Sequence, residues 1–314
     1  MSVGRVHEGY AMSERIGFVG LGLMGTGFTR RLIATGHDII GFDPDPARMD
    51  EAVARGVRPA ASAADVARAA DIILICVINT TAVEGATLGS RGIIQGDIAG
   101  KIVVDHSTAE IRATLRIAEQ LAARGAQFVD APVSGGPGAA ETGTLAIMAG
   151  GAEAAVARIA PLMRHLGTMT HMGGSGAGQA TKLVNQTIVL TNYCVLAEAL
   201  RLGEAYGVDT TKIAQALAPG HAGSNLMPVL LPRMIEKDFA PRGYVSQILK
   251  DLEMLQAAAA DEHVAMPMAA QALTLYRLLA ASGRSELDGS AVVTLYPEQK
   301  EASAALLDTP TPRP

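Results

Sequence analysis

The stretch Ile16-Gly-Phe-Val-Gly20-Leu-Gly22-Leu-Met-Gly25 decides the fold of the first half of the chain. It joins a short apolar strand to a G-x-G-x-x-G turn, and the helix that follows would end at Gly36. The turn alone is a weak signal, but between a strand and a helix it is typical of a dinucleotide-binding unit. Gly20 would allow the tight turn, Gly22 the approach of a pyrophosphate, and Gly25 the close packing of helix on strand. The alternative is a glycine-rich turn in another α/β fold.

Strands and helices alternate after this motif. The run from Ile72 to Ile78 is unbroken in apolar residues, as in a parallel strand whose two faces are both covered. Further strands are predicted at 37–43, 102–105, 128–130 and 145–149, and helices at 63–70 and 111–124. This alternation predicts a Rossmann-type, doubly wound parallel sheet as the N-terminal domain.

The second half of the chain has a different pattern. After the glycine-rich stretch 173–178, Leu, Val and Ala recur at helical spacing. Helices are predicted at 179–206, 210–218, 225–236, 244–261, 267–282 and 291–306. The predicted parts are a flexible leader at 1–13, a dinucleotide-binding domain at 14–175, an all-α C-terminal domain at 176–308 and a disordered tail at 309–314.

The composition narrows the class of partner. Apolar residues make up 49% of the 314 residues, and the formal net charge of −5 gives no basic surface for nucleic acid. No run reaches the roughly 18 uninterrupted apolar residues of a membrane span, and residues 1–13 lack the apolar core of a signal peptide. Cys76 and Cys194 lie in apolar runs, which fits reduced thiols. We therefore expect a cytoplasmic protein without nucleic-acid or membrane partners.

Asp43 follows the second predicted strand, 18 residues after Gly25. A carboxylate at this place accepts a hydrogen bond from the ribose 2′-OH and repels a 2′-phosphate, which favours NAD over NADP. Arg48, five residues on, is the nearest cation in the sequence and would still allow a phosphate to bind. The alternative is that Asp43 only caps the turn beside Pro44.

The stretch Asp130-Ala-Pro-Val-Ser134-Gly135-Gly136-Pro137 follows another predicted strand. In open α/β sheets, ligands bind at the carboxyl ends of the strands. The Ser134 hydroxyl and the backbone N–H groups of Gly135 and Gly136 would form a nest for a substrate carboxylate. The alternative is a turn in which proline and glycine serve the backbone alone.

Lys182 lies in the first turns of the long helix that begins at the domain boundary, and Asn185 and Gln186 share its helix face. In a closed cleft a lysine loses hydration, which lowers its pKa toward the range of a proton donor at neutral pH. The neighbouring amides would orient the ammonium without competing for its charge. The alternative is a solvated surface lysine, since lysines are mostly exposed.

Five motifs in this order resemble the signatures of the β-hydroxyacid dehydrogenase family, which includes 3-hydroxyisobutyrate dehydrogenases and tartronate semialdehyde (2-hydroxy-3-oxopropionate) reductases. They are Gly17 to Gly25, Asp105-His-Ser-Thr108, Asp130 to Gly136, Gly176 to Asn185, and Lys250-Asp251-Leu252. The resemblance implies a Rossmann domain and a helical domain that contributes to the substrate site and forms a homodimer or homotetramer. It also implies hydride transfer between NAD or NADP and a small anionic 3-hydroxy acid or its semialdehyde.

The resemblance also implies roles for particular residues, and it makes Lys182 the general acid and base. The residues at the substrate would be Ser134, Gly135, Gly136, Thr108, Asn185, Gln186 and Asp251. The residues at the cofactor would be Gly20, Leu21, Gly22, Leu23, Met24, Gly25, Asp43, Asn79, Thr108 and Lys250. No residues have metal-ligand spacing, so no metal is expected.

Two positions depart from the family pattern. Many members have Asn four residues after the lysine. This chain has Gln186 there, with Asn185 before it, and this Asn-Gln pair is similar to the one in the tartronate semialdehyde reductases. Several members have a substrate-facing Phe where this chain has Gly243, followed by Tyr244. There are two alternative functions. One is imine reduction on the same scaffold, although imine-reducing enzymes usually replace the lysine. The other is a nucleotide-binding module without catalysis. Phosphogluconate dehydrogenase shares the fold, but its helical part is longer.

Overall fold

The computed structural model describes residues 14–298. The predicted leader at 1–13 and the predicted tail at 309–314 lie outside the described residues, as do residues 299–306 of the last predicted helix. The contacts divide the chain into two units, Met1–Ala180 and Thr181–Pro314, which are described separately.

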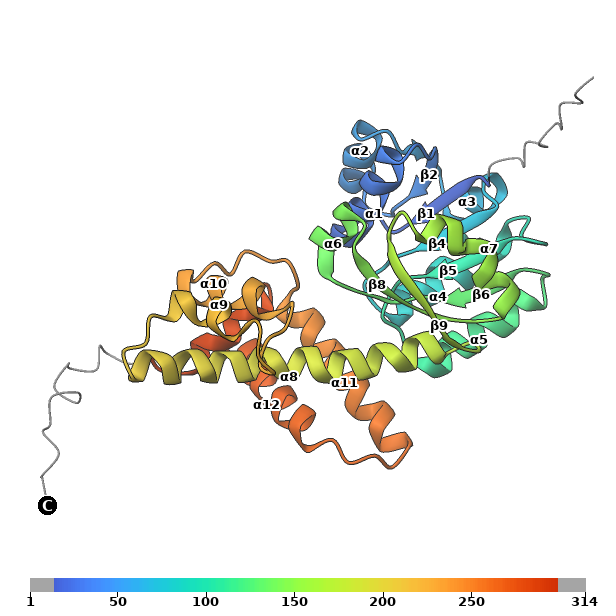
Figure 1. The fold of residues 1–314 in the computed structure, drawn as a ribbon. Coiled ribbons are helices and arrows are strands. Elements are labelled where there is room, and N and C mark those ends of the chain that lie inside the picture. Colours follow the sequence, from blue (N-terminus) through green and yellow to red (C-terminus); the bar gives the residue numbers. More distant parts are fainter. Residues whose placement is uncertain (1–13, 299–314) are drawn as a thin grey trace, which may run out of the picture. The chain divides into compact units, whose positions relative to one another are not determined.

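The first unit contains one sheet in the order β3-β2-β1-β4-β5-β6-β8-β7, with β9 paired to β8. The strands are β1 Ile16–Val19, β2 Ile39–Phe42, β3 Arg58–Pro59, β4 Ile72–Ile75, β5 Ile102–Asp105, β6 Gln127–Asp130, β7 Val133–Ser134, β8 Leu145–Gly150 and β9 Gly167–Gly173. All pairs from β3 to β6 are parallel, whereas β8 runs antiparallel to β6 and β7. The predicted Rossmann-type sheet is confirmed, and strands β7, β8 and β9 extend it beyond β6, with β8 and β9 running opposite to β6 (Figure 1).

Helices cover both faces of this sheet, and the side chains of the central strands alternate between two buried clusters. Ile72 and Leu74 of β4 belong to one cluster, and Ile73 and Ile75 belong to the other. The helices are α1 Leu23–Ala34, α2 Pro46–Ala54, α3 Ala63–Ala69, α4 Thr80–Leu88, α5 Ile111–Ala122, α6 Gly136–Thr142 and α7 Glu153–Met163. Burial on both faces explains why the strands are continuously apolar.

Some predicted boundaries of the first unit were wrong. The strand predicted at 72–78 ends at Ile75, because the N–H of Val77 donates to the Ser107 hydroxyl instead of to a neighbouring strand. The strand at 145–149 was predicted to close the unit, but α7 and the parallel strand β9 follow it. The helix α2 was not predicted, although Asp45 caps it and Pro46 begins it.

All named elements of residues 181–298 are helical. They are the rest of α8 Ala177–Ala205, α9 Ile213–Leu217, α10 Met227–Glu236, α11 Val245–Asp261, α12 Pro267–Ala281, and the 3₁₀ helices Thr210–Lys212 and Gly289–Leu295. The helix predicted at 291–306 is wrong within the described residues, because Asp288 caps a short 3₁₀ helix that ends before Pro297.

The long helix α8 has an exposed apolar stripe. Val184, Ile188, Val195 and Leu202 recur along one face, and each is about half exposed or more. By length and composition alone α8 is long and apolar enough to cross a membrane, a test that core helices of soluble proteins also pass. No apolar run in α8 reaches that length without interruption, because polar residues such as Asn185, Asn192 and Glu198 are spread along the helix.

Candidate active site

The glycine loop between β1 and α1 leaves one face of its backbone open. A Cβ at Gly20 would lie 2.2 Å from the carbonyl oxygen of Cys76, and one at Gly25 would lie 2.0 Å from that of Gly20. A Cβ at Gly22 would meet only the Arg48 side chain, at 3.5 Å. Gly22 also begins α1 without a side-chain cap, so the first N–H groups of the helix are not taken by the cap residue. The loop therefore fits the pyrophosphate of a dinucleotide.

Asp43 directly follows β2 and is almost completely buried. Its Oδ2 accepts a hydrogen bond of 2.7 Å from the N–H of Leu21 in the glycine loop. Its Oδ1 accepts one of 3.0 Å from the N–H of Asp45, so the residue also caps the turn, as the alternative interpretation held. The carboxylate is thus held against the glycine loop, in the place where it would accept a hydrogen bond from the ribose 2′-OH of a bound dinucleotide.

Asn79, Ser107 and Thr108 follow the carboxyl ends of β4 and β5. The Ser107 hydroxyl accepts a hydrogen bond of 2.9 Å from Val77, and the Ser107 N–H donates to Asp105 at 2.9 Å. Asn79 caps α4, since its Oδ1 accepts the N–H of Ala82 at 2.8 Å. These contacts fix the two loops to each other and to the sheet edge at which ligands bind.

The predicted carboxylate loop is held by backbone conformation. Ser134 ends β7, and Gly135 and Gly136 lead into α6 with φ of 131° and 71°. Residues that carry a side chain rarely adopt these positive φ values, so the backbone conformation requires glycine here. A Cβ at Gly136 would meet nothing within 4 Å, which leaves its backbone accessible.

A buried contact that the sequence analysis did not assign ties the start of α8 to the sheet. Asp130, at the end of β6, accepts hydrogen bonds from the N–H groups of Gly176 at 2.8 Å and Gln179 at 2.9 Å. The Gln179 side chain accepts from the N–H of Ala109 at 3.1 Å and donates to the carbonyl of Ser107 at 2.8 Å. The helix that carries Lys182 therefore begins on the ends of β5 and β6. Asp130 and Gln179 both belong to motifs that carry the family resemblance, Asp130 to Gly136 and Gly176 to Asn185, and this was the sequence signal for the contact.

In the second unit a chain of polar contacts joins α8 to α11. Asn185 donates to Gln186 Oε1 at 2.8 Å, and Gln186 donates to Asp251 Oδ2 at 2.6 Å. The Lys250 ammonium lies 2.9 Å from Asp251 Oδ1. Lys182, one turn earlier on α8, is buried, and so is Gln186. Four predicted site residues far apart in the sequence are thus joined. The other predicted substrate residues, Thr108 and the Ser134 loop, belong to the first unit.

Family models match nearly the whole described chain. The NAD-binding domain of 6-phosphogluconate dehydrogenase matches residues 15–174, and the NAD-binding domain of NADP-dependent 3-hydroxyisobutyrate dehydrogenase matches residues 176–296. The 2-hydroxy-3-oxopropionate reductase of Escherichia coli K12 is 38% identical over 280 residues, which are 89% of this chain and 96% of that protein. The chain belongs to the β-hydroxyacid dehydrogenase family.

Two further comparisons place the chain within this family of β-hydroxyacid dehydrogenases. The 2-(hydroxymethyl)glutarate dehydrogenase of Eubacterium barkeri is 34% identical over 295 residues, 93% of this chain and 98% of that protein. The crystal structure of a 3-hydroxyisobutyrate dehydrogenase from Salmonella typhimurium has a TM-score of 0.82 at 27% identity, and the match covers 90% of this chain and 100% of that one. The predicted enzyme class, an NAD(P)-dependent 3-hydroxyacid dehydrogenase, and the predicted cofactor, NAD or NADP, are confirmed.

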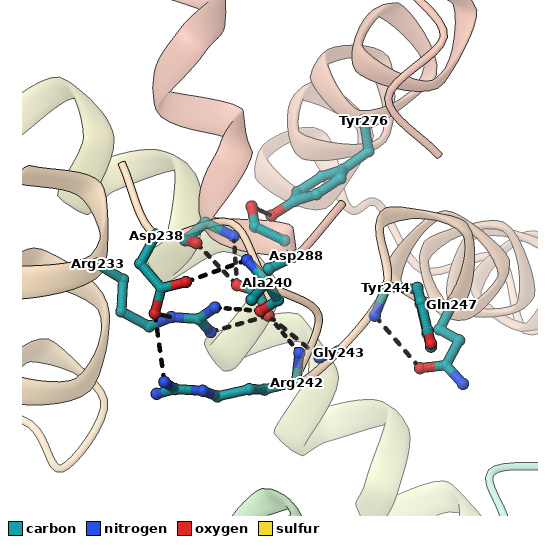
Figure 2. A network of polar contacts seen from close by, with 11 residues as sticks. Arg233, Asp238, Ala240, Arg242, Gly243, Tyr244, Gln247, Tyr276 and Asp288 are labelled. Atoms are coloured by element: carbon teal, nitrogen blue, oxygen red, sulfur yellow. Dashed lines mark hydrogen bonds and ion pairs between the residues drawn. The ribbon is translucent and has the colours of Figure 1, made fainter. Parts of the chain in front are cut away.

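The segment that departs from the β-hydroxyacid dehydrogenase pattern is built around a buried ion pair, Arg233 with Asp288 at 2.9 Å (Figure 2). Asp288 Oδ2 also accepts the N–H groups of Arg242 at 2.9 Å and Gly243 at 3.1 Å. A Cβ at Gly243 would meet nothing within 4 Å, so the position of the missing Phe is open. Tyr244 caps α11 beside it. Arg233 and Asp288 are 55 residues apart, and no local sequence pattern predicted their ion pair.

Proposed function

We propose that the chain transfers hydride between the nicotinamide of NAD or NADP and a small 3-hydroxy carboxylate or its semialdehyde, with Lys182 as the general acid and base. The observation that carries the proposal is the polar chain Asn185–Gln186–Asp251–Lys250, which begins one turn after Lys182 on α8. Buried amides and charges are costly unless they are paired, so a helix face that collects them is better suited to a polar ligand than to a core.

Lys182 would move the proton. Bound nicotinamide supplies or takes the hydride at its C4. During reduction, the Lys182 ammonium donates a proton to the oxygen of the substrate carbonyl as it becomes an alkoxide, and during oxidation the neutral amine accepts it from the hydroxyl. The Gln186 amide is fixed by its bond to Asp251 and in turn orients Asn185. The two amides would hold the substrate hydroxyl near the ammonium without adding charge.

The other predicted residues are assigned by where they lie. The carboxylate of the substrate would bind the Ser134 hydroxyl and the open backbone of Gly135 and Gly136. Thr108, Asn185, Gln186 and Asp251 would face the substrate. The cofactor would contact Gly20, Leu21, Gly22, Leu23, Met24, Gly25, Asp43, Asn79, Thr108 and Lys250.

The substrate class follows from the relatives. By their names, the two sequence relatives act on 2-hydroxy-3-oxopropionate and on 2-(hydroxymethyl)glutarate, which both carry the reacting oxygen on the carbon β to a carboxylate. We propose the same relation for this chain, with 2-hydroxy-3-oxopropionate or 3-hydroxyisobutyrate as the first candidates.

A substrate panel tests the proposal directly. Short 3-hydroxy acids, their semialdehydes, 2-hydroxy acids without a 3-hydroxyl and cyclic imines are each assayed with NAD and NADP in the matching redox state. Turnover confined to the 3-hydroxy acids and semialdehydes supports the proposal. Turnover of the imines alone, or cofactor binding without turnover of any compound, contradicts it.

We propose further that α8 pairs with a second copy of the chain, as a homodimer or within a homotetramer. The stripe Val184, Ile188, Val195 and Leu202 runs along about 27 Å of helix and exposes apolar surface that a symmetric copy would cover. A stripe variant, Leu202→Glu, should lower the mass measured by light scattering in detergent-free buffer. A wild-type monomer there would contradict the proposal.

The reduced thiols Cys76 and Cys194 support a cytoplasmic location.

A further inference from the structure

Arg48 lies at the adenosine end of the glycine loop. It belongs to the first turn of α2, and its side chain is 54% exposed. Its Nη1 lies 3.9 Å from Asp43 Oδ2, and the same atom is the nearest neighbour, at 3.5 Å, of the position that a Cβ of Gly22 would occupy. The guanidinium is therefore beside both parts of the loop that read a dinucleotide: the open backbone at Gly22 and the carboxylate of Asp43.

The Asp43 carboxylate is partly committed before any ligand binds. Each of its oxygens accepts one backbone N–H, from Leu21 and from Asp45. A carboxylate has about four lone-pair positions, so acceptor capacity is left for a ribose hydroxyl. The two N–H groups and the Arg48 guanidinium also offset its negative charge, which weakens the repulsion that Asp43 alone would exert on a 2′-phosphate.

The donors of Arg48 are held loosely. Its contact with Asp43 is 3.9 Å and its Nε lies 3.4 Å from Asp45 Oδ2, both longer than the roughly 2.7–3.2 Å of an N–H···O hydrogen bond. A guanidinium has five N–H donors in a fork that matches a phosphate. A phosphate on the ribose would therefore find donors that neither carboxylate holds at hydrogen-bonding distance.

We propose that Arg48 determines cofactor specificity by binding the 2′-phosphate of NADP, so that this chain binds NADP as well as NAD although Asp43 follows β2. With NAD, Asp43 accepts the ribose 2′-OH. With NADP, Arg48 donates to the phosphate next to a carboxylate whose charge is already offset. The inference concerns the dinucleotide alone and does not depend on the substrate or on Lys182, so its failure and that of the proposed function are separate.

Calorimetry without substrate tests the proposal. The titrants are NAD, NADP, and the pair 5′-AMP and adenosine 2′,5′-bisphosphate, which differ only by the 2′-phosphate. The Arg48→Gln variant is expected to weaken binding of NADP and of the bisphosphate by about tenfold or more, and binding of NAD and 5′-AMP by less than about twofold. Higher salt should weaken NADP binding more than NAD binding in the wild type, because the site is half exposed.

Arg68→Gln is the matched control. Arg68 is also 54% exposed and also pairs with an aspartate three residues away, Asp65, as Arg48 does with Asp45. The control should leave all four affinities unchanged. A wild type that does not bind NADP, an Arg48→Gln variant identical to the control, or an equal loss of NAD and NADP would each overturn the proposal.

Discussion

Asp130 and Gln179 are joined by a buried hydrogen bond of 2.9 Å between a carboxylate oxygen and a backbone N–H, at the point where α8 begins. The same carboxylate accepts the N–H of Gly176, and glycine is required at 178 because a Cβ there would lie 2.3 Å from the Asp130 carbonyl oxygen. The helix that carries Lys182 is therefore anchored on β6 by one acidic side chain. Its start is defined by this carboxylate more than by helix propensity.

Asp130→Asn should destabilise the protein by about 1–3 kcal/mol at pH 7, because the amide turns an N–H₂ group toward backbone N–H groups. Burial raises the pKa of Asp130, and hydrogen bonds from the N–H groups of Gly176 and Gln179 lower it. The effect of burial is the larger one, so the pKa is about 6. The wild type therefore gains stability relative to the variant as pH falls from about 6 to 4. Urea unfolding at pH 7.5 and pH 4.5 measures the difference, and an equal deficit at both values would contradict the account.

His106 should show the opposite pH dependence. It is buried, its Nδ1 lies 2.7 Å from the Ala131 carbonyl oxygen and its ring stacks on Phe28, and burial lowers its pKa to about 4. The neutral ring thus contributes stability above pH 6.5 that is lost as pH falls toward 4, on the order of 3 kcal/mol.

A non-titrating variant isolates this effect. His106→Asn keeps a donor for Ala131, and its stability should change less than that of the wild type between pH 6.5 and 4.5. The exposed His221→Asn serves as the control and should follow the wild-type curve. Parallel curves for the wild type and His106→Asn would show that His106 does not titrate in this window.

The glycine loop predicts a separation of stability from binding. Gly25→Ala should cost about 1–3 kcal/mol, because its Cβ would lie 2.0 Å from a backbone oxygen. Gly22→Ala should change stability by only a few tenths of a kcal/mol, since only a flexible side chain is near, yet weaken NAD binding by tenfold or more. Thermal unfolding and calorimetry measure the two effects. A Gly22→Ala variant with wild-type affinity would remove the pyrophosphate from this loop.

The chemistry of single motifs was predictable from the sequence, and long-range pairings were not. The glycine loop and the buried strands depend on residues within one turn or one strand, so local patterns predict them. The bond from Gln179 to Asp130 joins residues 49 apart, and no local pattern encodes it. The strand β9 was missed because it is mostly exposed and alternates little. The strand β8 was predicted, but its antiparallel direction was not, because the residues of a strand do not determine its direction in the sheet.

The contacts of the candidate site show the same difference between local and long-range pairs. The i,i+3 and i,i+4 spacing on α8 grouped Asn185 and Gln186 with Lys182, and the structure joins the two amides by a hydrogen bond. The bond from Gln186 to Asp251 required the packing of α11 on α8, which only the resemblance to the family hinted at. The neighbours of Asp43 show the limit: the sequence predicted a carboxylate after β2 and named Arg48 as its nearest cation, but the distance of 3.9 Å between the two side chains came only from the structure.

The ion pair of Arg233 with Asp288 holds the segment that leads into α11. Burial alone would raise the pKa of Asp288, but hydrogen bonds from Ser290, Arg242 and Arg233 hold it below its usual value. Asp288→Asn removes the negative charge that pairs with the buried Arg233 guanidinium, and it should lower the free energy of unfolding by about 3–5 kcal/mol. Hydrogen exchange at the amides of Arg242 and Gly243 should accelerate. Asp238→Asn, at a carboxylate that is 35% exposed, is the control, and equal small losses in both variants would contradict this role.

The most direct test of the whole account is the turnover of Lys182→Ala with the best substrate of the panel, measured beside its affinity for the cofactor. We expect kcat to fall by about 10²–10⁴ while the Kd for NAD stays within about twofold, because a general acid is removed and the dinucleotide loop is not touched. Lys212→Ala, at an exposed lysine of the same unit, should leave both values unchanged. A Lys182→Ala enzyme with wild-type turnover would contradict the assignment of Lys182 and the mechanism built on it.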